Sequence, residues 1–384
     1  MRVLIFRTNG NIVNLKTYNL QEIGIAKALI SKGIECDVMY YGGNAPTHED
    51  IIQYEDSHIR VIWAKGFSVA GNGFFPNVGE ILKEYDIIQV CEYDQLFSRY
   101  LAFFSKYKKR VCMTHGPYYN VTNRKYNLKI KLIDRLWIPR KAKENIWMFA
   151  KSNYAKEFLS ERGFKKIAVT GVGLDIKRFD GNETAKKGKV VKDLEEFKQN
   201  DRLLLYIGQI SERRNIIFLL NIFKEVSKDI PNCKLAILGD GPEDYKEACK
   251  KEISKLGIEK NIYYAQKVPQ DQVPLIYRMS DLFLLPTNYE IFGMVMLEAM
   301  FFGTPFLTTD NGGSATVIKD GENGFILPLD VERWCVTIKE LLSNRDKAKA
   351  ISMKAHETIV QDYTWDKIVN KMVDAYHQIL LGLQ

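Results

Sequence analysis

Residues 287–313, TNYEIFGMVMLEAMFFGTPFLTTDNGG, are the stretch that settles how this sequence folds. They follow the apolar run DLFLLP and contain a polar loop, an apolar helix that begins near Gly293 and a short strand-like run, TPFLTT. Glu290 lies in the loop, and Glu298 follows eight positions later within the helix. The free backbone N–H groups of a helix's first turn and the helix dipole favour an anion such as a diphosphate. The stretch therefore predicts an anion site at the helix start, with both carboxylates at the edge of the ligand.

The same alternation of short apolar runs and helices extends outward from this stretch. In the second half the strand-like runs are RLLLYIG, KLAILG, NIYYA and GFILP, and in the first half RVLIF opens a similar series. Such alternation is typical of a parallel sheet covered by helices on both faces. We expect an α/β chain of two Rossmann-like, doubly wound domains that face a central cleft.

The polar, charged stretch DGNETAKKGKVVKDLEEFKQND separates the two series and reads as a linker. The last helix places Trp365, Ile368, Val369 and Met372 at helical spacing, so one of its faces must be buried. The expected organisation is an N-terminal domain over 1–178, a linker over 179–200, a C-terminal domain over 201–364, and a final helix over 365–384 that crosses back to the N-terminal domain.

The composition is that of an ordinary globular protein. Of the 384 residues, 46% are hydrophobic and 27% are charged, which excludes a mainly disordered or collagen-like chain. The six cysteines lie far apart without a C-x-x-C pair, so neither a zinc site nor a disulfide framework is expected. The opening MRVLIFRTNGN reads as a strand and not as a signal peptide, and no stretch is apolar enough to span a bilayer. We expect a cytoplasmic protein.

Positive charge is concentrated in the first half. Residues 1–200 hold 33 Lys and Arg against 22 Asp and Glu, whereas the remaining residues hold 22 against 25. Residues 121–145 alone hold eight basic and two acidic side chains, interleaved with apolar ones. This pattern predicts an amphipathic helix at an anionic membrane surface, although a domain helix with its apolar side in the core fits it equally well. The residues expected on the acceptor or membrane side are Tyr118, Tyr119, Lys129, Lys131 and Arg135.

Ligands of open parallel sheets bind beyond the carboxyl ends of the strands. His115 ends the strand-like run VCMTH, so we expect it at that edge of the first domain. Gly239 and Gly241 form a tight turn after KLAILG, a pattern that is also typical of a plain β-to-α turn.

Several of these motifs resemble those of one family. The pair Glu290 and Glu298 within IFGMVMLEAMFFGTPFLTTDNGG, the ILGDGP turn, the YNLQEIGIAKALISKGIECDVMYY stretch, the MTHG turn and GVGLDIKRF are similar to the large retaining, nucleotide-sugar-dependent "group 1" (family-4-like) glycosyltransferases of GT-B fold. The resemblance covers nearly all of the second half and parts of the first.

The resemblance implies roles for individual residues. Glu290 takes the position that contacts the donor sugar's hydroxyls, Glu298 the position that binds the ribose, and His115 the position that contacts the transferred sugar. The phosphate-binding Gly-Arg and Lys of the family correspond to the run GQISERRN, in which Gln209 replaces the arginine and Arg214 replaces the lysine. Gln209 cannot neutralise charge, and Arg213 can supply the second cation. Thr316 is a second departure, because that position is usually acidic in the family.

We therefore predict catalytic roles for His115, Glu290 and Arg214. The predicted donor-binding residues are Gly10, Gly208, Gln209, Arg213, Arg214, Gly239, Gly241, Lys267, Val268, Glu290, Phe292, Gly293, Met294, Val295 and Glu298.

The predicted function is transfer of a hexose or N-acetylhexosamine, with retention, from a nucleoside diphosphate sugar to a glycan or lipid-linked glycan of a bacterial-type polysaccharide or glycolipid pathway. A UDP-sugar is favoured over a GDP-sugar. No cofactor or metal is expected, because the sequence has no D-x-D triplet. Two alternatives stay open: a nucleotide-sugar 2-epimerase of the same fold, and a catalytically impaired GT-B scaffold that binds glycans. A nucleic-acid partner would explain the charge but not the motifs of the second half.

Overall fold

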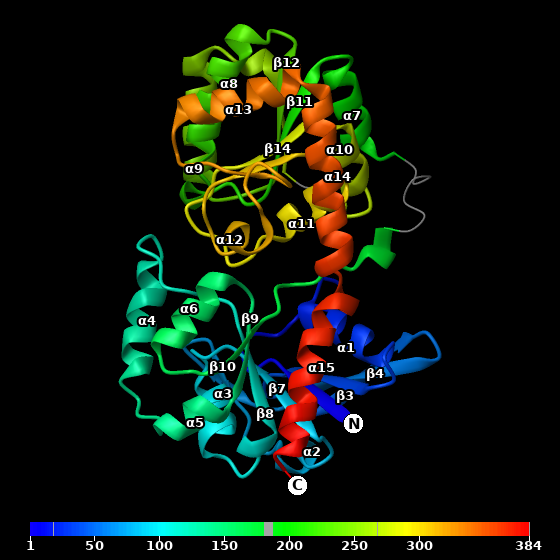
Figure 1. The fold of residues 1–384 in the computed structure, drawn as a ribbon, viewed down its shortest axis with the longest axis vertical. Helices are drawn as coiled ribbons and strands as arrows, with labels where there is room; N and C mark the ends of the chain where they lie inside the picture. The colour runs from blue at the N-terminus through cyan, green and yellow to red at the C-terminus, as the bar shows by residue number, and fades with distance from the viewer. Residues whose placement is uncertain (18, 180–186, 267, 384) are drawn as a thin grey trace. The chain divides into compact units, whose positions relative to one another are not determined.

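The computed structural model describes residues 1–17, 19–179, 187–266 and 268–383 and divides the chain into two units (Figure 1). Unit 1 comprises Met1–Asp175 together with Thr364–Gln384, and unit 2 comprises Ile176–Tyr363. Each unit is built around its own parallel sheet.

In the described part of unit 1, eight strands form the main sheet in the order β10-β9-β8-β7-β1-β2-β4-β3. All neighbours are parallel except β3 and β4, which form an antiparallel hairpin at one edge. Apolar strands such as RVLIF in β1 are buried because helices cover both faces of the sheet. The strands are β1 (Arg2–Phe6), β2 (Glu35–Tyr41), β3 (His48–Tyr54), β4 (Ser57–Ala64), β7 (Ile87–Cys91), β8 (Val111–His115), β9 (Trp147–Ala150) and β10 (Lys166–Val169), with β5 (Phe67–Val69) and β6 (Asn72–Phe74) forming a separate small hairpin.

The longest helix of unit 1 is the last one, α15, with 17 residues. The helices of this unit are α1 (Gln21–Ile30), α2 (Gly79–Leu82), α3 (Leu96–Arg99), which continues as a π-helix over Tyr100–Phe104, α4 (Arg124–Asp134), α5 (Arg140–Asn145), α6 (Asn153–Glu161) and α15 (Trp365–Leu381).

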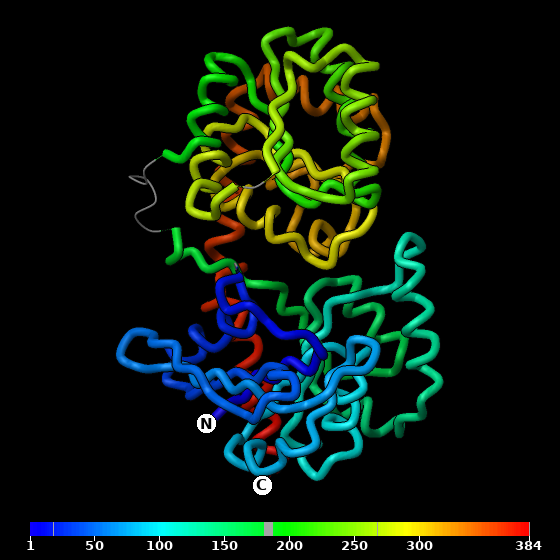
Figure 2. Tube along the Cα trace, turned by 180° about the vertical axis from the view of Figure 1, so that it is seen from behind, coloured from blue at the N-terminus to red at the C-terminus, as the bar shows by residue number. Residues whose placement is uncertain are grey.

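Helix α15 returns the chain to unit 1, where both chain ends lie (Figure 2). A Cβ atom on Gly24 or Gly173 would lie within 2.4 Å of the Trp365 indole, so the two glycines leave the space that this ring fills. Further along the helix, the buried Tyr376 hydroxyl donates to Gln89 Oε1 at 2.6 Å. The expected burial of one face of this helix follows from these contacts.

In the described part of unit 2, six strands form an entirely parallel sheet in the order β13-β12-β11-β14-β15-β16. The strands are β11 (Arg202–Ile207), β12 (Cys233–Leu238), β13 (Ile262–Ala265), β14 (Leu282–Leu285), β15 (Phe306–Thr308) and β16 (Phe325–Ile326). The helices are α7 (Lys189–Lys198), α8 (Ile216–Asp229), α9 (Glu243–Leu256), α10 (Val273–Met279), α11 (Met294–Phe301), α12 (Ser314–Val317), α13 (Val331–Ser343) and α14 (Arg345–Asp362). The predicted α/β fold class, with a Rossmann-like parallel sheet in each half, is confirmed.

The stretch 179–200, predicted as a linker, differs from the expectation in its second half. Helix α7 occupies 189–198 and buries Val191 and Leu194, which are spaced to one side of the helix. The side-chain amide oxygen of Gln272 accepts from Gly188 N at 2.6 Å just before the helix. Because most of the stretch is polar or charged, its sequence pattern did not indicate these two buried apolar positions.

Candidate functional site

The loops at the carboxyl ends of β11 and β12 are packed backbone against backbone. A Cβ atom on Gly239 would lie 1.8 Å from the Gly208 carbonyl oxygen, and one on Gly241 would lie 1.7 Å from the Ile210 carbonyl oxygen. No side chain fits at such distances, so both glycines of the loop after β12 are needed for it to meet the loop after β11. Gly208, Gly239 and Gly241 of the predicted site are therefore brought together.

The loop after β14 is braced by the loop after β15. Gly293 precedes α11 with φ at +87°, a left-handed conformation that favours glycine. A Cβ atom on Gly313 would lie 1.7 Å from the Phe292 carbonyl oxygen, and Gly312 N donates to the Glu290 carbonyl at 3.1 Å. These contacts fix the backbone on both sides of Glu290.

Two guanidinium groups converge on the Glu290 carboxylate. The short 3-10 turn Glu212–Arg214 after β11 presents Arg214, whose Nη2 lies 2.5 Å from Glu290 Oε2, and Arg213, whose Nη1 lies 4.0 Å from the same oxygen. Arg213 Nη1 also donates to the Tyr289 carbonyl. Residues predicted from separate motifs, GQISERRN and TNYEIFG, thus form one cluster.

The Arg213–Arg214–Glu290 cluster carries more positive than negative charge and has unused donors. Buried Nε and Nη1 of Arg214 have no hydrogen-bond partner among the described residues, nor has the buried hydroxyl of Ser211 one turn earlier. Burial and the neighbouring Arg214 charge lower the pKa of Arg213. Buried polar groups are almost always hydrogen-bonded, so unused donors beside two cations indicate an anion site.

A reciprocal amide pair, which the sequence analysis did not identify, holds this turn against the loop after β14. Asn215 Nδ2 donates to Asn288 Oδ1 at 2.9 Å, and Asn288 Nδ2 lies 3.3 Å from Asn215 Oδ1. Asn215 begins α8 with φ at +51°, a conformation that asparagine tolerates better than most residues. The signal that the sequence offered for this pair is the asparagine that directly follows the two arginines.

Glu298 lies in a different environment from Glu290. It is 3% exposed, and Oε2 accepts from the buried Tyr277 hydroxyl at 3.0 Å. Glu298 lies in the second turn of α11, whereas the Glu290 carboxylate is fixed by arginines in the preceding loop.

The remaining predicted donor residues of unit 2 vary in exposure. Gln209 is exposed and its carbonyl accepts from the Tyr206 hydroxyl at 2.7 Å, while Met294 and Val295 are half-buried in the first turn of α11. Phe292 is buried, Val268 is half-buried, and Lys267 lies outside the described residues. Thr316 Oγ1 donates to the Gly312 carbonyl at 2.7 Å.

His115 lies in unit 1, fully buried at the end of β8. Its Nδ1 lies 2.9 Å from Glu92 Oε2, and Lys151 Nζ lies 2.9 Å from Glu92 Oε1. Burial would raise the pKa of Glu92, but the Lys151 charge, the His115 contact and the Gly116 N–H outweigh it and hold that pKa well below its usual range. The Tyr93 N–H also donates to Nδ1 at 3.3 Å, and the buried Nε2 has no hydrogen-bond partner among the described residues.

Glu92, Asp94 and His115 are close enough together to be considered as metal ligands, because their ligand atoms lie within 4.8 Å of one another. Both carboxylates already face a lysine: Lys151 at Glu92, and Lys129 Nζ at 2.5 Å from Asp94 Oδ2. A cation would have to displace these two ammonium groups, so the arrangement fits an ion-pair cluster better than a metal centre. Glu92 also has φ at +65°, a strained conformation that the contacts hold in place.

The other predicted residues of unit 1 fall into two groups. Gly10 packs against the β5–β6 hairpin, where a Cβ atom would lie 2.1 Å from Ser68 Oγ. Tyr118 is buried beside Tyr154, with the two ring centres 5.2 Å apart, and its acceptor-side role stays a prediction. Tyr119, Lys131 and Arg135 are exposed and Lys129 is half-buried, and their role on the acceptor or membrane side stays a prediction.

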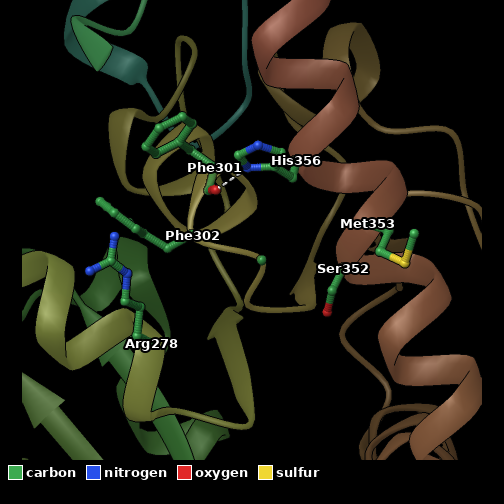
Figure 3. A pocket seen from close by; sticks show the side chains of 7 residues that line it. Arg278, Phe301, Phe302, Ser352, Met353 and His356 are labelled. Carbon is green, nitrogen blue, oxygen red and sulfur yellow. Dashed lines mark hydrogen bonds between the residues drawn. The ribbon is translucent and has the colours of Figure 1, made fainter. Parts of the chain in front are cut away.

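A separate pocket of about 490 Å³ lies elsewhere in unit 2 (Figure 3). It is formed by α10, the end of α11 and α14, and Arg278, Phe302 and His356 are among its lining residues. None of the predicted site residues lines it, so it is distinct from the Arg213–Arg214–Glu290 cluster.

Comparison with known proteins finds a family that is similar to the second unit. Residues 191–358 match the family described as "Glycosyl transferases group 1". An uncharacterized glycosyltransferase of Methanocaldococcus jannaschii is 26% identical over 178 residues, which are 46% of this chain and 45% of that protein. The chain spans about half the length of the curated relatives it matches.

Solved structures match nearly the whole chain at low identity. Sucrose-phosphate synthase from Thermosynechococcus elongatus superposes with a TM-score of 0.74 at 16% identity over 100% of both chains. An Anabaena protein solved in complex with UDP-glucose gives 0.69 at 17% identity, over 98% of this chain and 100% of that one. The predicted fold and family resemblance are confirmed: the chain has the GT-B fold, and residues 191–358 are similar to the group 1 glycosyltransferases.

Proposed function

We propose that the protein is a retaining glycosyltransferase that moves a hexose or N-acetylhexosamine from a nucleoside diphosphate sugar to a glycan or lipid-linked glycan. The observation that supports this most is the Arg213–Arg214–Glu290 cluster with its unused buried donors. A diphosphate supplies the charge and the acceptor oxygens that this cluster lacks. A UDP-sugar is favoured over a GDP-sugar, in keeping with the UDP-glucose bound to the Anabaena protein of similar fold.

In the proposed reaction the largest charge develops on the departing diphosphate. Arg214 and Arg213, together with the positive end of the α11 helix dipole, stabilise it, because groups that are already in position need no rearrangement as the charge forms. The Arg214–Glu290 ion pair then has to loosen. The diphosphate takes over the guanidinium, and the released Glu290 carboxylate accepts the hydroxyls of the sugar. His115 stays a predicted catalytic residue of unit 1.

We also propose that turnover needs no metal ion. The two arginines can neutralise the diphosphate charge, and the one candidate cluster of metal-ligating side chains among the described residues is compensated by Lys129 and Lys151. Activity should be unchanged after treatment with EDTA. Complete loss with EDTA that manganese restores would contradict this part of the proposal.

Helix α4 supports peripheral contact with an anionic membrane. Its inner face buries Ile130 and Ile133, yet a second apolar row, Leu128, Leu132 and Leu136, is 51–63% exposed along the outside. The helix thus has an apolar face in the core, as one reading of the sequence predicts, and another in contact with solvent. Trp137, 75% exposed, extends the outer row.

Cations flank this outer row, and α4 lies at the outer edge of unit 1 (Figure 1). Apolar side chains inserted at the headgroup level, with Lys and Arg beside anionic lipids, are how amphipathic helices bind a bilayer surface. No helix among the described residues is long and apolar enough to cross a membrane. The exposed basic residues of α4 and the turn after it are Arg124, Lys125, Lys131 and Arg135.

The donor proposal is tested by thermal shift with UDP-glucose, UDP-N-acetylglucosamine and GDP-mannose. A donor at about 100 times its Kd should add ~2.7 kcal/mol to the free energy of unfolding. Turnover of the best donor is then followed with and without glycan acceptors. Isomerisation of the donor alone would favour a 2-epimerase, and binding without turnover would favour a non-catalytic scaffold.

The membrane proposal is tested by flotation with vesicles of phosphatidylglycerol and phosphatidylcholine. We expect salt-sensitive binding that Leu128→Ser combined with Leu132→Ser abolishes. Met353→Ser, at an equally exposed apolar position of unit 2, is the matched control and should bind like the wild type. Binding that the double variant leaves unchanged would discard α4 as the contact surface.

A further inference from the structure

Unit 1 contains a pocket of about 520 Å³ that neither the family motifs nor the proposed function uses, with a lining of aromatic and aliphatic side chains together with polar groups. It lies between α2 and the α3–π-helix segment. Pockets of ~300–1,000 Å³ lined mainly by hydrophobic and aromatic side chains are the usual sites of small ligands. Phe75 and Phe97 form its floor. Both are buried, and their rings pack edge to face with the ring centres 5.1 Å apart.

Two hydroxyls of the lining already donate hydrogen bonds within the protein. The Tyr107 hydroxyl donates to the Gly79 carbonyl at 2.7 Å, and the Ser105 hydroxyl donates to the Leu101 carbonyl at 2.8 Å. A ligand therefore meets ring faces and methyl groups inside the pocket, together with hydroxyls that are already bonded. This lining favours an apolar occupant.

The rim of the pocket is partly exposed and basic. Tyr100 and Phe104, at the two ends of the π-helix, are 51% and 52% exposed. Lys106 lines the pocket, with its ammonium 5.3 Å from the centre of the Tyr107 ring, and the next residues continue the positive charge as Lys108, Lys109 and Arg110. The rim therefore suits an anionic group at the end of an apolar ligand.

The wall that carries Tyr100 and Phe104 has an uncommon backbone. A π-helical turn has poorer geometry than an α-helix and occurs frequently at functional sites. Here it places both rings at the mouth of the pocket, whereas a continued α-helix would rotate Phe104 relative to Tyr100.

We propose that this pocket binds one long acyl or isoprenoid chain that ends in an anionic headgroup, with the chain between α2 and the π-helix and the headgroup beside Lys106. The proposal goes beyond the donor site and does not depend on it. It also does not depend on α4, whose exposed row would contact a bilayer surface and not a single chain.

The test uses the full chain and dodecyl phosphate below its micelle concentration, followed by isothermal titration calorimetry. Inorganic phosphate is the headgroup-only arm, and dodecyl maltoside is the arm with an uncharged headgroup. We expect one dodecyl phosphate per chain, no binding of phosphate, and binding of the maltoside at least threefold weaker. Equal binding of phosphate and dodecyl phosphate would overturn the proposal, as would no binding of either chain.

Two variants locate the site. Gly79 has an ordinary φ, and a Cβ atom there would meet no heavy atom closer than 3.7 Å, so Gly79→Met should place its side chain in the pocket and weaken dodecyl phosphate binding at least tenfold. Gly382→Met, at a glycine of unit 1 with similar free space, is the control and should bind like the wild type. Phe104→Glu, at the exposed rim, should weaken binding even if the first variant folds poorly.

The donor-induced thermal shift should be the same in all three variants, which separates this proposal from the glycosyltransferase proposal. Wild-type affinity for dodecyl phosphate in either folded Gly79→Met or folded Phe104→Glu would assign the binding to another surface and overturn the proposal.

Discussion

Glu290 has two partners in this account, Arg214 in the free protein and the donor sugar in the complex. The carboxylate holds the guanidinium at 2.5 Å, so it competes with a diphosphate for the same cation. Glu290→Gln should therefore leave UDP affinity equal or tighter, because Arg214 is released, while turnover of a UDP-sugar falls ~100-fold, or ~2.7 kcal/mol. Calorimetry with UDP and a turnover assay measure the two effects, and a variant that loses UDP binding would contradict this role.

We expect the hydrogen bond between Tyr277 and Glu298 to contribute more to the free energy of unfolding than a bond to an exposed acid would. The Tyr277 hydroxyl donates to the buried carboxylate at 3.0 Å, and both residues are almost fully buried. Tyr277→Phe removes that donor and should lower the free energy of unfolding by ~1.5–3 kcal/mol, the range for hydrogen bonds to charged groups. Urea denaturation checks this, with Tyr264→Phe at an exposed position as the control. A cost of less than half a kcal/mol would show that Glu298 does not depend on this bond.

At the scale of elements, the site depends on two loops whose backbones touch with no side chain between them. Gly241→Ala would place a Cβ atom 1.7 Å from the Ile210 carbonyl oxygen, so the loops after β11 and β12 must move apart. We expect a loss of ~2–4 kcal/mol in stability and weaker UDP binding, because the Arg214 turn follows Ile210. Gly79→Ala, with free space around it, is the control for a plain glycine substitution. Wild-type UDP affinity in Gly241→Ala would show that the loop contact does not position the arginines.

The strand ends of β7, β8 and β9 are joined by the Glu92, His115 and Lys151 cluster. The pKa of Glu92 is lowered on folding, so its ion pairs contribute stability above the unfolded-state value of ~4.3, and that contribution is lost as the pH falls below it. Glu92→Gln leaves Lys151 without its carboxylate and should cost ~3 kcal/mol at pH 7.

The difference between wild type and Glu92→Gln should shrink as the pH is lowered from 5 to 3, because the Glu92 carboxyl of the unfolded wild-type chain takes up a proton in this range while the folded one stays ionised. Urea denaturation at several pH values measures it, and other carboxylates cancel in the comparison. A difference that stays constant down to pH 3 would mean that the Glu92 charge contributes nothing.

At the scale of the whole molecule, the sequence patterns predict the two α/β units well, because buried parallel strands appear as uninterrupted apolar runs such as RLLLYI. Periodicity could not show the antiparallel strand β3, whose HEDIIQY is mostly exposed, or α7, whose two buried positions stand among charges. The motifs identified Arg213, Arg214 and Glu290, which the fold then brings together. Glu92 and Lys151 could not be found this way, because they are 59 residues apart and meet only across the sheet.

Titration of UDP and of uridine into the wild type and Arg214→Ala tests most directly the claim that the Arg213–Arg214–Glu290 cluster binds a diphosphate. Arg140→Ala, at an exposed arginine of unit 1, is the control. We predict that the wild type binds UDP more tightly than uridine by ~2–3 kcal/mol, or ~30- to 150-fold in Kd, and that Arg214→Ala removes most of this preference. Equal affinities for UDP and uridine in the wild type, or an undiminished preference in Arg214→Ala, would contradict the account.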